Sequence, residues 1–364
     1  MDKRVKGLDA LRLFAVCIVM LFHYAYRGAV GEQAFTALTV PAWHPVAKYG
    51  HLGVHLFFVI SGFVIAKSTE GRSPLEFVLA RFTRIYPAFL ICMTLTFAVT
   101  VLFGAPAFTA TLKQYLANLV IFSPALHQPF LDGAYWSIVY EIIFYGWVTL
   151  LLAGRRFDRW ATPVALVWMM ISVANEYFGP SVGVRRLFLT DASGFFLAGI
   201  IIYRLHAEGP SLRRWVMLAV ATELAAGQAI VTSRYNVEHY GAVLSKPVIV
   251  AIAVAAVALV WLCTQMRRAI LPKGVAVAIG GMTYPLYLIH QHAGFIVFNH
   301  LDGVVPREVL VVGTMAGMML VAFAIYAVLE RPAQRALRRV LHVPRLAGWW
   351  PGRRPTAAAA PLEG

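Results

Sequence analysis

Long apolar runs separated by short polar segments dominate the sequence. Most runs hold about 17–25 residues, which is the length that an α-helix needs to cross a hydrocarbon layer about 30 Å thick. The pattern therefore predicts an all-α integral membrane protein, a bundle of about ten transmembrane helices. We place them near residues 8–26, 48–67, 84–103, 135–153, 161–178, 187–204, 214–232, 247–265, 276–298 and 308–329.

The apolar segment 112–125 is shorter than the others and is interrupted by Lys113, Gln114 and Asn118. If it does not cross the membrane and the N-terminus is cytoplasmic, the basic clusters share the cytoplasmic side, as positive residues usually do. A crossing at 112–125 would move the cluster Arg155–Arg159 and all later clusters to the outside. We therefore predict a re-entrant or interfacial helix on the outer side, with both termini cytoplasmic.

Composition and charge fit this topology. Hydrophobic residues make up 60% of the chain and charged residues only 13%, which excludes a soluble globular protein. The net charge of +15 follows from the cytoplasmic basic clusters and anionic lipid, and no nucleic-acid-binding motif accompanies it. We expect a membrane domain over 1–335 and a basic cytoplasmic tail over 336–364, partly disordered. Residues 332–343, across the boundary of these two regions, are predicted to form an amphipathic surface helix, with Trp349 and Trp350 as anchors.

Without a soluble domain, any chemistry must lie among the helices, where ionisable side chains usually mark function. Arg12 and His23 are eleven residues apart in the first span, on one helical face and about 16 Å apart along it. Helical rise also places five side chains in one layer near the outer surface: His23, His51, His55, Glu141 and His290. Each of these residues also has an explanation that involves no function. Arg12 would extend its guanidinium group to the lipid headgroups, and a single histidine would form a hydrogen bond between helices.

Other polar and small residues carry weaker signals. His51 and His55 are spaced as half of a metal site, but without a third ligand we predict no metal. Glu141 needs an arginine or histidinium partner. Ser61 is interpreted as a packing residue and not as a nucleophile. The small residues Gly62 and Gly313/Gly317 are expected to allow close helix approach.

On the inner side, Arg81 and Arg84 precede Pro87, which is expected to bend the helix. These arginines are either ordinary topology-setting flanks or phosphate ligands, for which arginine is well suited.

Several segments together resemble acyltransferase family 3, over roughly residues 5–335. They are Arg12-(ten residues)-His23, GHLGVHLFFVISGFVI (50–65), RFTRIYP (81–87), WSIVYEIIFY (136–145), YPLYLIHQ (284–291) and Glu330-Arg331-Pro332. Members of this family are polytopic membrane O-acyltransferases that modify cell-surface polysaccharides and related acceptors. The chain is similar to the form without a C-terminal hydrolase-like domain. His55 occupies a position where many members have an acidic residue.

The resemblance implies an acyl-CoA-dependent enzyme that transfers acyl groups other than amino-acyl groups. The acyl group, usually acetyl, would pass from cytoplasmic acyl-CoA to a hydroxyl of a carbohydrate or related acceptor at the outer face. The motif residues carried over as essential are Arg12 and His23. Arg81 and Arg84 would hold the nucleotide, the pantetheine arm would pass Arg12, and the thioester would reach His23.

Two routes for the chemistry stay open: His23 as a general base, oriented by Glu141 or His290, or a transient acyl-histidine. The expected location is the cell membrane, the inner membrane in a bacterium, and a homo-oligomer is compatible with the sequence. The rival hypothesis is a proton-coupled transporter or flippase, because it too uses intramembrane Arg, Glu and His. A transporter is expected to show broken helices paired between two related halves, and the sequence shows neither.

Overall fold

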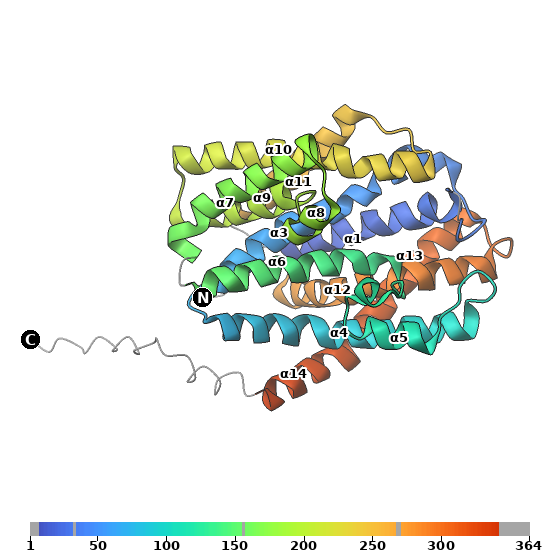
Figure 1. The fold of residues 1–364 in the computed structure, drawn as a ribbon. Helices are drawn as coiled ribbons and strands as arrows, with labels where there is room; N and C mark the ends of the chain where they lie inside the picture. The colour runs from blue at the N-terminus through green and yellow to red at the C-terminus, as the bar shows by residue number, and fades with distance from the viewer. Residues whose placement is uncertain (1–6, 32–33, 155–156, 267–270, 342–364) are drawn as a thin grey trace, which may run out of the picture.

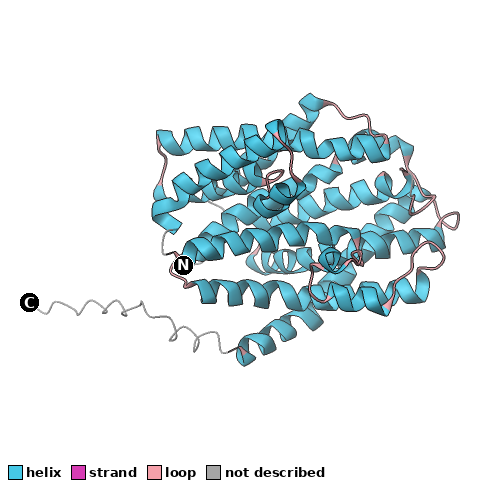
Figure 2. Ribbon diagram, in the orientation of Figure 1, coloured by secondary structure: helices cyan, strands magenta, loops and turns pink. Residues whose placement is uncertain are grey.

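The helices lie nearly side by side along one direction, as the computed structural model shows (Figure 1). The structure describes residues 7–31, 34–154, 157–266 and 271–341, and within these ranges it is helical with connecting loops and no strand (Figure 2). The helices are α1 (Leu8–Ala25), α2 (His44–Ala47), α3 (Gly53–Thr69), α4 (Pro74–Phe103), α5 (Leu112–Asn118), α6 (Trp136–Ala153), α7 (Phe157–Val173), α8 (Val182–Phe188), α9 (Ser193–Glu208), α10 (Leu212–Tyr240), α11 (Lys246–Gln265), α12 (Lys273–Leu301), α13 (Arg307–Ala324) and α14 (Arg331–Val340).

Shorter turns complete the path. Two π-helical turns, Ala174–Phe178 and Ile325–Glu330, continue α7 and α13. The 3₁₀ turns are Arg27–Ala29, Pro41–Trp43, Gly50–Leu52, Ser123–Leu126 and Gly133–Tyr135.

The all-α membrane architecture is confirmed. Among the described residues, eight helical stretches are long and apolar enough to cross a membrane. The other two expected spans correspond to α7, a shorter apolar helix, and to α12, which is long enough but carries several polar residues. The total of ten and the cytoplasmic side of the termini stay predictions.

Segment 112–125 contains only the seven-residue helix α5 and the turn Ser123–Leu126, so it is too short to span the bilayer as a helix. Helix α14 covers most of the predicted amphipathic segment 332–343, whereas Trp349, Trp350 and most of the tail lie outside the described residues.

Helix α4 begins ten residues before the expected start at 84, and the sequence explains why. Ser73 and Glu76 form a capping box, in which each side chain bonds the backbone N–H of the other residue, and Pro74 occupies the first helical position. Arg81 and Arg84 therefore lie inside a helix and not before one. The helix continues without interruption through Pro87.

Close packing at the centre depends on two glycines of neighbouring helices. A Cβ on Gly62 of α3 would collide with the backbone of Phe196 in α9, and one on Gly199 of α9 would collide with the backbone at Val59 and Phe63. The prediction for Gly62 is therefore confirmed. The prediction for Gly313 and Gly317 is wrong for contacts within the chain, because a Cβ at either would meet no described atom within 4 Å.

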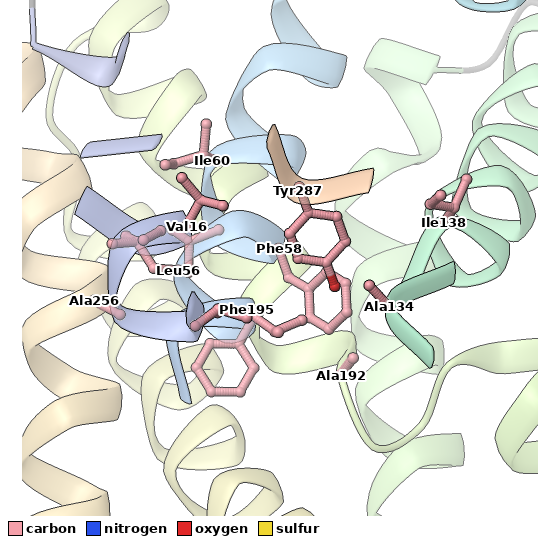
Figure 3. Close-up of a cluster of buried hydrophobic side chains, with 14 of the residues drawn as sticks. Val16, Leu56, Phe58, Ile60, Ala134, Ile138, Ala192, Phe195, Ala256 and Tyr287 are labelled. Atoms are coloured by element: carbon pink, nitrogen blue, oxygen red, sulfur yellow. The ribbon is translucent and has the colours of Figure 1, made fainter. Parts of the chain in front are cut away.

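The buried core surrounds α3 and joins it to α1, α6, α9, α11 and α12. Figure 3 shows part of this core and labels, among others, Val16 of α1, Phe58 of α3, Phe195 of α9 and Tyr287 of α12. These helices are held together by interlocking apolar side chains.

Candidate functional site

Three hollows follow one another between α1, α3, α4, α6 and α12. The first, which we call the basic cavity, has a volume of about 570 Å³. Of its described lining residues, seven are basic and two are acidic: Arg12, Lys67, Arg81, Arg84, Arg331, Arg335, Arg338, Asp9 and Glu330. Its walls include α14, where Gln334 donates to the carbonyl oxygen of Arg84 (3.1 Å) and to Glu330 Oε1 (2.7 Å). An excess of positive charge makes this cavity suited to an anionic ligand.

The second hollow, the middle cavity, has a volume of about 110 Å³ and shares Arg12, Arg81 and Arg84 with the basic cavity. Arg12 also contacts Asp9, with Nη1 3.3 Å from Oδ1. Two donors on this wall, Arg81 Nε and the hydroxyl of Tyr284, are buried and have no hydrogen-bond partner among the described residues. Unsatisfied buried donors are uncommon in proteins, so a ligand is a natural partner for them.

Glu141 lines the middle cavity as well. Its Oε1 accepts hydrogen bonds from Ser61 Oγ (3.3 Å) and from the hydroxyl of Tyr145. The expectation that Glu141 shares the layer of His23 is wrong, since Glu141 lines the cavity of Arg12 and Arg81 and not the one of His23. Counting residues from the end of a span assumes that all helices begin at one level and have equal tilts, which packed helices do not satisfy.

The third hollow, the histidine cavity, has a volume of about 820 Å³ and contains His23, His51 and His55 as the sequence predicted. It shares Val54, Phe58 and Tyr287 with the middle cavity, and we call these three residues the throat. Because each cavity shares lining residues with the next, the hollows adjoin one another in a series from Arg338 at one end to His23 at the other.

His23 lines this cavity and forms a pair with His290, which is not one of the lining residues, with ring centroids 5.2 Å apart. His290 is fully buried, and its Nδ1 lies 2.8 Å from the carbonyl oxygen of Tyr287. Within the part of the chain that the structure describes, His23 Nδ1 and His290 Nε2 have no hydrogen-bond partner. The hydroxyl of Tyr24 donates to the carbonyl oxygen of His290 at 2.5 Å and thereby fixes α12 against α1.

The other two histidines are engaged differently. The ring of His51 contacts the carbonyl oxygen of Lys48 (2.9 Å) and Ser233 Oγ (3.0 Å). His55 stacks face to face on Phe195, with a centroid distance of 4.3 Å, and its Nε2 is 3.4 Å from Thr232 Oγ1. Both nitrogens of His51 and Nε2 of His55 therefore have polar contacts, whereas His55 Nδ1 is buried and has no hydrogen-bond partner in the described part of the chain. No group of three or more potential metal ligands occurs among the described residues.

The structure adds residues that the sequence did not indicate. Asp132 is fully buried and accepts from the backbone N–H groups of Ala134 (2.8 Å) and His292 (2.9 Å), so it joins the start of α6 to α12 beside the histidine pair. Arg27 lies between the rings of Phe35 and Tyr240, at 4.6 and 4.0 Å from their centroids. Arg27 follows His23 by four residues, a helical spacing that the sequence contained.

Comparison with known proteins identifies the family. The model of an acyltransferase domain family, Acyl_transf_3, matches residues 5–327, so the chain belongs to this family. It is 26% identical over 315 residues to the exopolysaccharide production protein ExoZ of Rhizobium meliloti, covering 80% of this chain and 94% of that protein. It is 28% identical to nodulation protein 10 of Rhizobium leguminosarum bv. viciae, covering 53% and 54% of the two chains.

A shorter match, 36% identical over 100 residues, relates 25% of the chain to 14% of the O-acetyltransferase OatA of Staphylococcus aureus. No solved structure gives a significant match to this chain.

Proposed function

We propose that this membrane acyltransferase moves an acyl group, in the first instance acetyl, from cytoplasmic acyl-CoA to a hydroxyl of a cell-surface carbohydrate. The observation that carries the proposal is the series of adjoining hollows, which is basic at one end and lined by histidines at the other. Family membership supplies acyl transfer as the reaction class, and the names of two relatives refer to exopolysaccharide production and O-acetyl transfer.

The basic cavity fits the nucleotide part of acyl-CoA, which carries several phosphate charges. Arg81 and Arg84 line both this cavity and the middle one, so they bind phosphates near the point where the pantetheine arm enters. The narrow middle cavity accommodates an extended chain and not a nucleotide. In this arrangement Arg12 lies beside the arm, and the thioester passes the throat to reach His23.

His23 is the general base of the proposed reaction, a role that typically contributes about 10²–10⁴-fold. A ring nitrogen of His23 takes the proton of the acceptor hydroxyl while the oxygen attacks the thioester carbon. The C–S bond then breaks, and the CoA thiolate leaves and takes up the proton. His290 is the neighbour that orients the imidazole. Glu141 accepts hydrogen bonds from Ser61 and Tyr145 in the donor path and positions these two side chains instead of contacting His23.

The orientation in the cell belongs to the same proposal. The basic cavity faces the cytoplasm, where acyl-CoA is made, and the histidine cavity faces outward in the cell membrane. The competing transporter hypothesis shares the intramembrane charges but has no family support, because the matching family is an acyltransferase family.

The test uses purified protein in liposomes with radiolabelled acetyl-CoA and a saccharide fraction from the native host lacking this gene. Wild-type protein is expected to label the saccharide and to release CoA thiol in step with it. His23→Ala is expected to lose transfer by at least about a hundredfold. His206→Ala is the matched control, because His206 is exposed and lines none of the three cavities.

Two results contradict the proposal. Normal transfer by His23→Ala excludes both the general-base and the acyl-histidine route. Movement of saccharide across the membrane without CoA release identifies a carrier instead of an enzyme.

A further inference from the structure

One wall of the histidine cavity carries side chains that line neither the middle cavity nor the basic cavity. It consists of the start of α6 and of the connection from α7 through α8 to α9. Four of its side chains line the cavity together with His23: Trp136, Tyr140, Arg185 and Asp191. Neither the histidine pair nor the arginines of the basic cavity hydrogen-bond to this group within the described residues.

Asp191 carries an unused hydrogen-bond acceptor. Its Oδ2 accepts from the hydroxyl of Tyr140 at 2.9 Å, which fixes the carboxylate. Its Oδ1 is buried and has no partner among the described residues, although the side chain lines the cavity. Leaving a buried charged acceptor unsatisfied is costly, so a ligand that brings a donor to this oxygen gains a charge-assisted hydrogen bond.

A second network holds Arg185 in place beside Asp191. The carboxylate of Glu176, whose side chain is fully buried, accepts two hydrogen bonds from Arg185, at 3.0 Å from Nε and 2.7 Å from Nη2. It also accepts from Thr190 Oγ1 (2.5 Å) and Asn175 Nδ2 (2.9 Å). Glu176 lies on the π-helical turn that ends α7, and these bonds tie that turn to the residues just before Asp191. The guanidinium is thus positioned before any ligand arrives.

The third component is aromatic. The Trp136 side chain is 41% exposed although it lines the cavity, and its ring meets that of Tyr140 edge to face at 5.2 Å. Tyr140 is in turn stacked on Phe58, with a centroid distance of 6.0 Å. This support leaves part of the Trp136 ring free to cover an apolar surface of a ligand.

We propose that Trp136, Tyr140, Arg185 and Asp191 form a subsite for a neutral sugar ring of the acceptor, next to the residue that is acylated. Asp191 Oδ1 accepts from one ring hydroxyl, Arg185 donates to the adjacent oxygen, and Trp136 packs on the C–H face of the ring. A paired carboxylate and guanidinium match neighbouring hydroxyls, each of which both donates and accepts.

Charge favours a neutral ring over an acidic one. Arg185 is already paired with Glu176. Together with Asp191, these two residues therefore carry more negative than positive charge. A uronic acid placed against Asp191 would meet like charge in a partly desolvated wall. The cavity volume of about 820 Å³ lies within the range of about 300–1,000 Å³ usual for ligand pockets, which leaves room for more than the reacting residue.

This inference rests on the proposed function, and the experiment separates the two. Transfer of labelled acetyl groups to the saccharide fraction of the host lacking the gene is measured at increasing saccharide and, separately, at increasing acetyl-CoA. Asp191→Asn is expected to raise the half-saturating saccharide concentration about tenfold or more, because a charged hydrogen bond is lost. Half-saturation by acetyl-CoA should stay at the wild-type value.

Two further variants complete the design. Trp136→Leu tests the platform at a partly exposed position, where folding depends little on the ring, and should raise the same saccharide constant. Asp302→Asn is the matched control and should change neither constant, since Asp302 lines none of the three cavities and pairs with Arg307 at 3.2 Å.

The outcomes separate as follows. If wild-type protein labels no saccharide, the proposed function fails. If wild-type protein transfers but Asp191→Asn and Trp136→Leu keep the wild-type saccharide constant, the subsite is refuted. A fall in maximal rate and thermal stability with both half-saturation values unchanged assigns Asp191 a structural role and equally overturns it.

Discussion

The throat between the middle and histidine cavities gives the most direct test of the route for the acyl chain. Val54 lines both cavities and is 7% exposed, whereas it does not line the basic cavity. The substitution Val54→Phe places a ring where the thioester must pass, beside Phe58 and Tyr287. It leaves the phosphate-binding arginines unchanged.

The expected size of the effect follows from the space available. The middle cavity holds only about 110 Å³, which is less than either of the two cavities that adjoin it. Exchanging an isopropyl group for a phenyl ring takes up a substantial part of this space. A displacement of the thioester by about 1 Å costs about a hundredfold in rate, so we expect at least this loss in maximal transfer rate.

The assay compares two quantities in one preparation. Acetyl transfer from labelled acetyl-CoA should fall in Val54→Phe, while the affinity for CoA should stay unchanged because the basic cavity is intact. Overfilling a packed interior costs about 1–3 kcal/mol, so thermal unfolding is recorded to confirm that the variant is folded. Val54→Ala widens the throat and is the matched control, with transfer close to that of the wild type.

One result would refute the reasoning. If Val54→Phe is folded, binds CoA normally and transfers acetyl at the wild-type rate, the acyl chain does not pass between these cavities. The series of hollows would then have no bearing on catalysis.

Three other predictions follow from the described contacts. Arg81→Ala should weaken CoA binding about tenfold in calorimetry, because it removes a charged hydrogen bond. Arg338→Ala, at the edge of the basic cavity, should weaken CoA binding less. Equal effects of the two substitutions would contradict the assigned phosphate site. His290→Asn should lower the maximal rate, but by less than the loss of about 10²–10⁴-fold expected for a substitution of His23. The half-saturating acyl-CoA concentration should stay unchanged. An unaltered maximal rate would remove His290 from the mechanism. Gly62→Ala should destabilise the fold by about 1–3 kcal/mol in thermal unfolding, since the added Cβ meets the α9 backbone. Gly313→Ala should be neutral or slightly stabilising, because its Cβ meets no described atom within 4 Å. Equal effects of the two substitutions would contradict the packing argument.

The sequence was sufficient for the elements and for the reaction class. Apolar length alone located the spans, because a bilayer allows a helix only where about 20 residues bury their backbone polar groups internally. The missed start of α4 was also encoded locally, in the capping box of Ser73 and Glu76. His23, His51 and His55 were expected in one layer and do line one cavity, since they lie near the same ends of consecutive spans.

The sequence could not show which side chains meet across helices. Glu141 was expected near His23 but hydrogen-bonds Ser61 and Tyr145 in the donor path, because helix tilt and rotation are set by packing and not by position along the chain. The paired glycines illustrate the same limit, since Gly62 packs against α9 whereas Gly313 faces no described neighbour.

What the sequence determined by itself was therefore everything that depends on the bilayer and on nearest neighbours along the chain: the helices, their apolar lengths and the charged ends. Tertiary structure alone decided the succession of three cavities, the pairing of His23 with His290 and the wall around Asp191. Each of these joins residues from separate helices, and their meeting depends on how the helices rotate and slide to interlock their side chains.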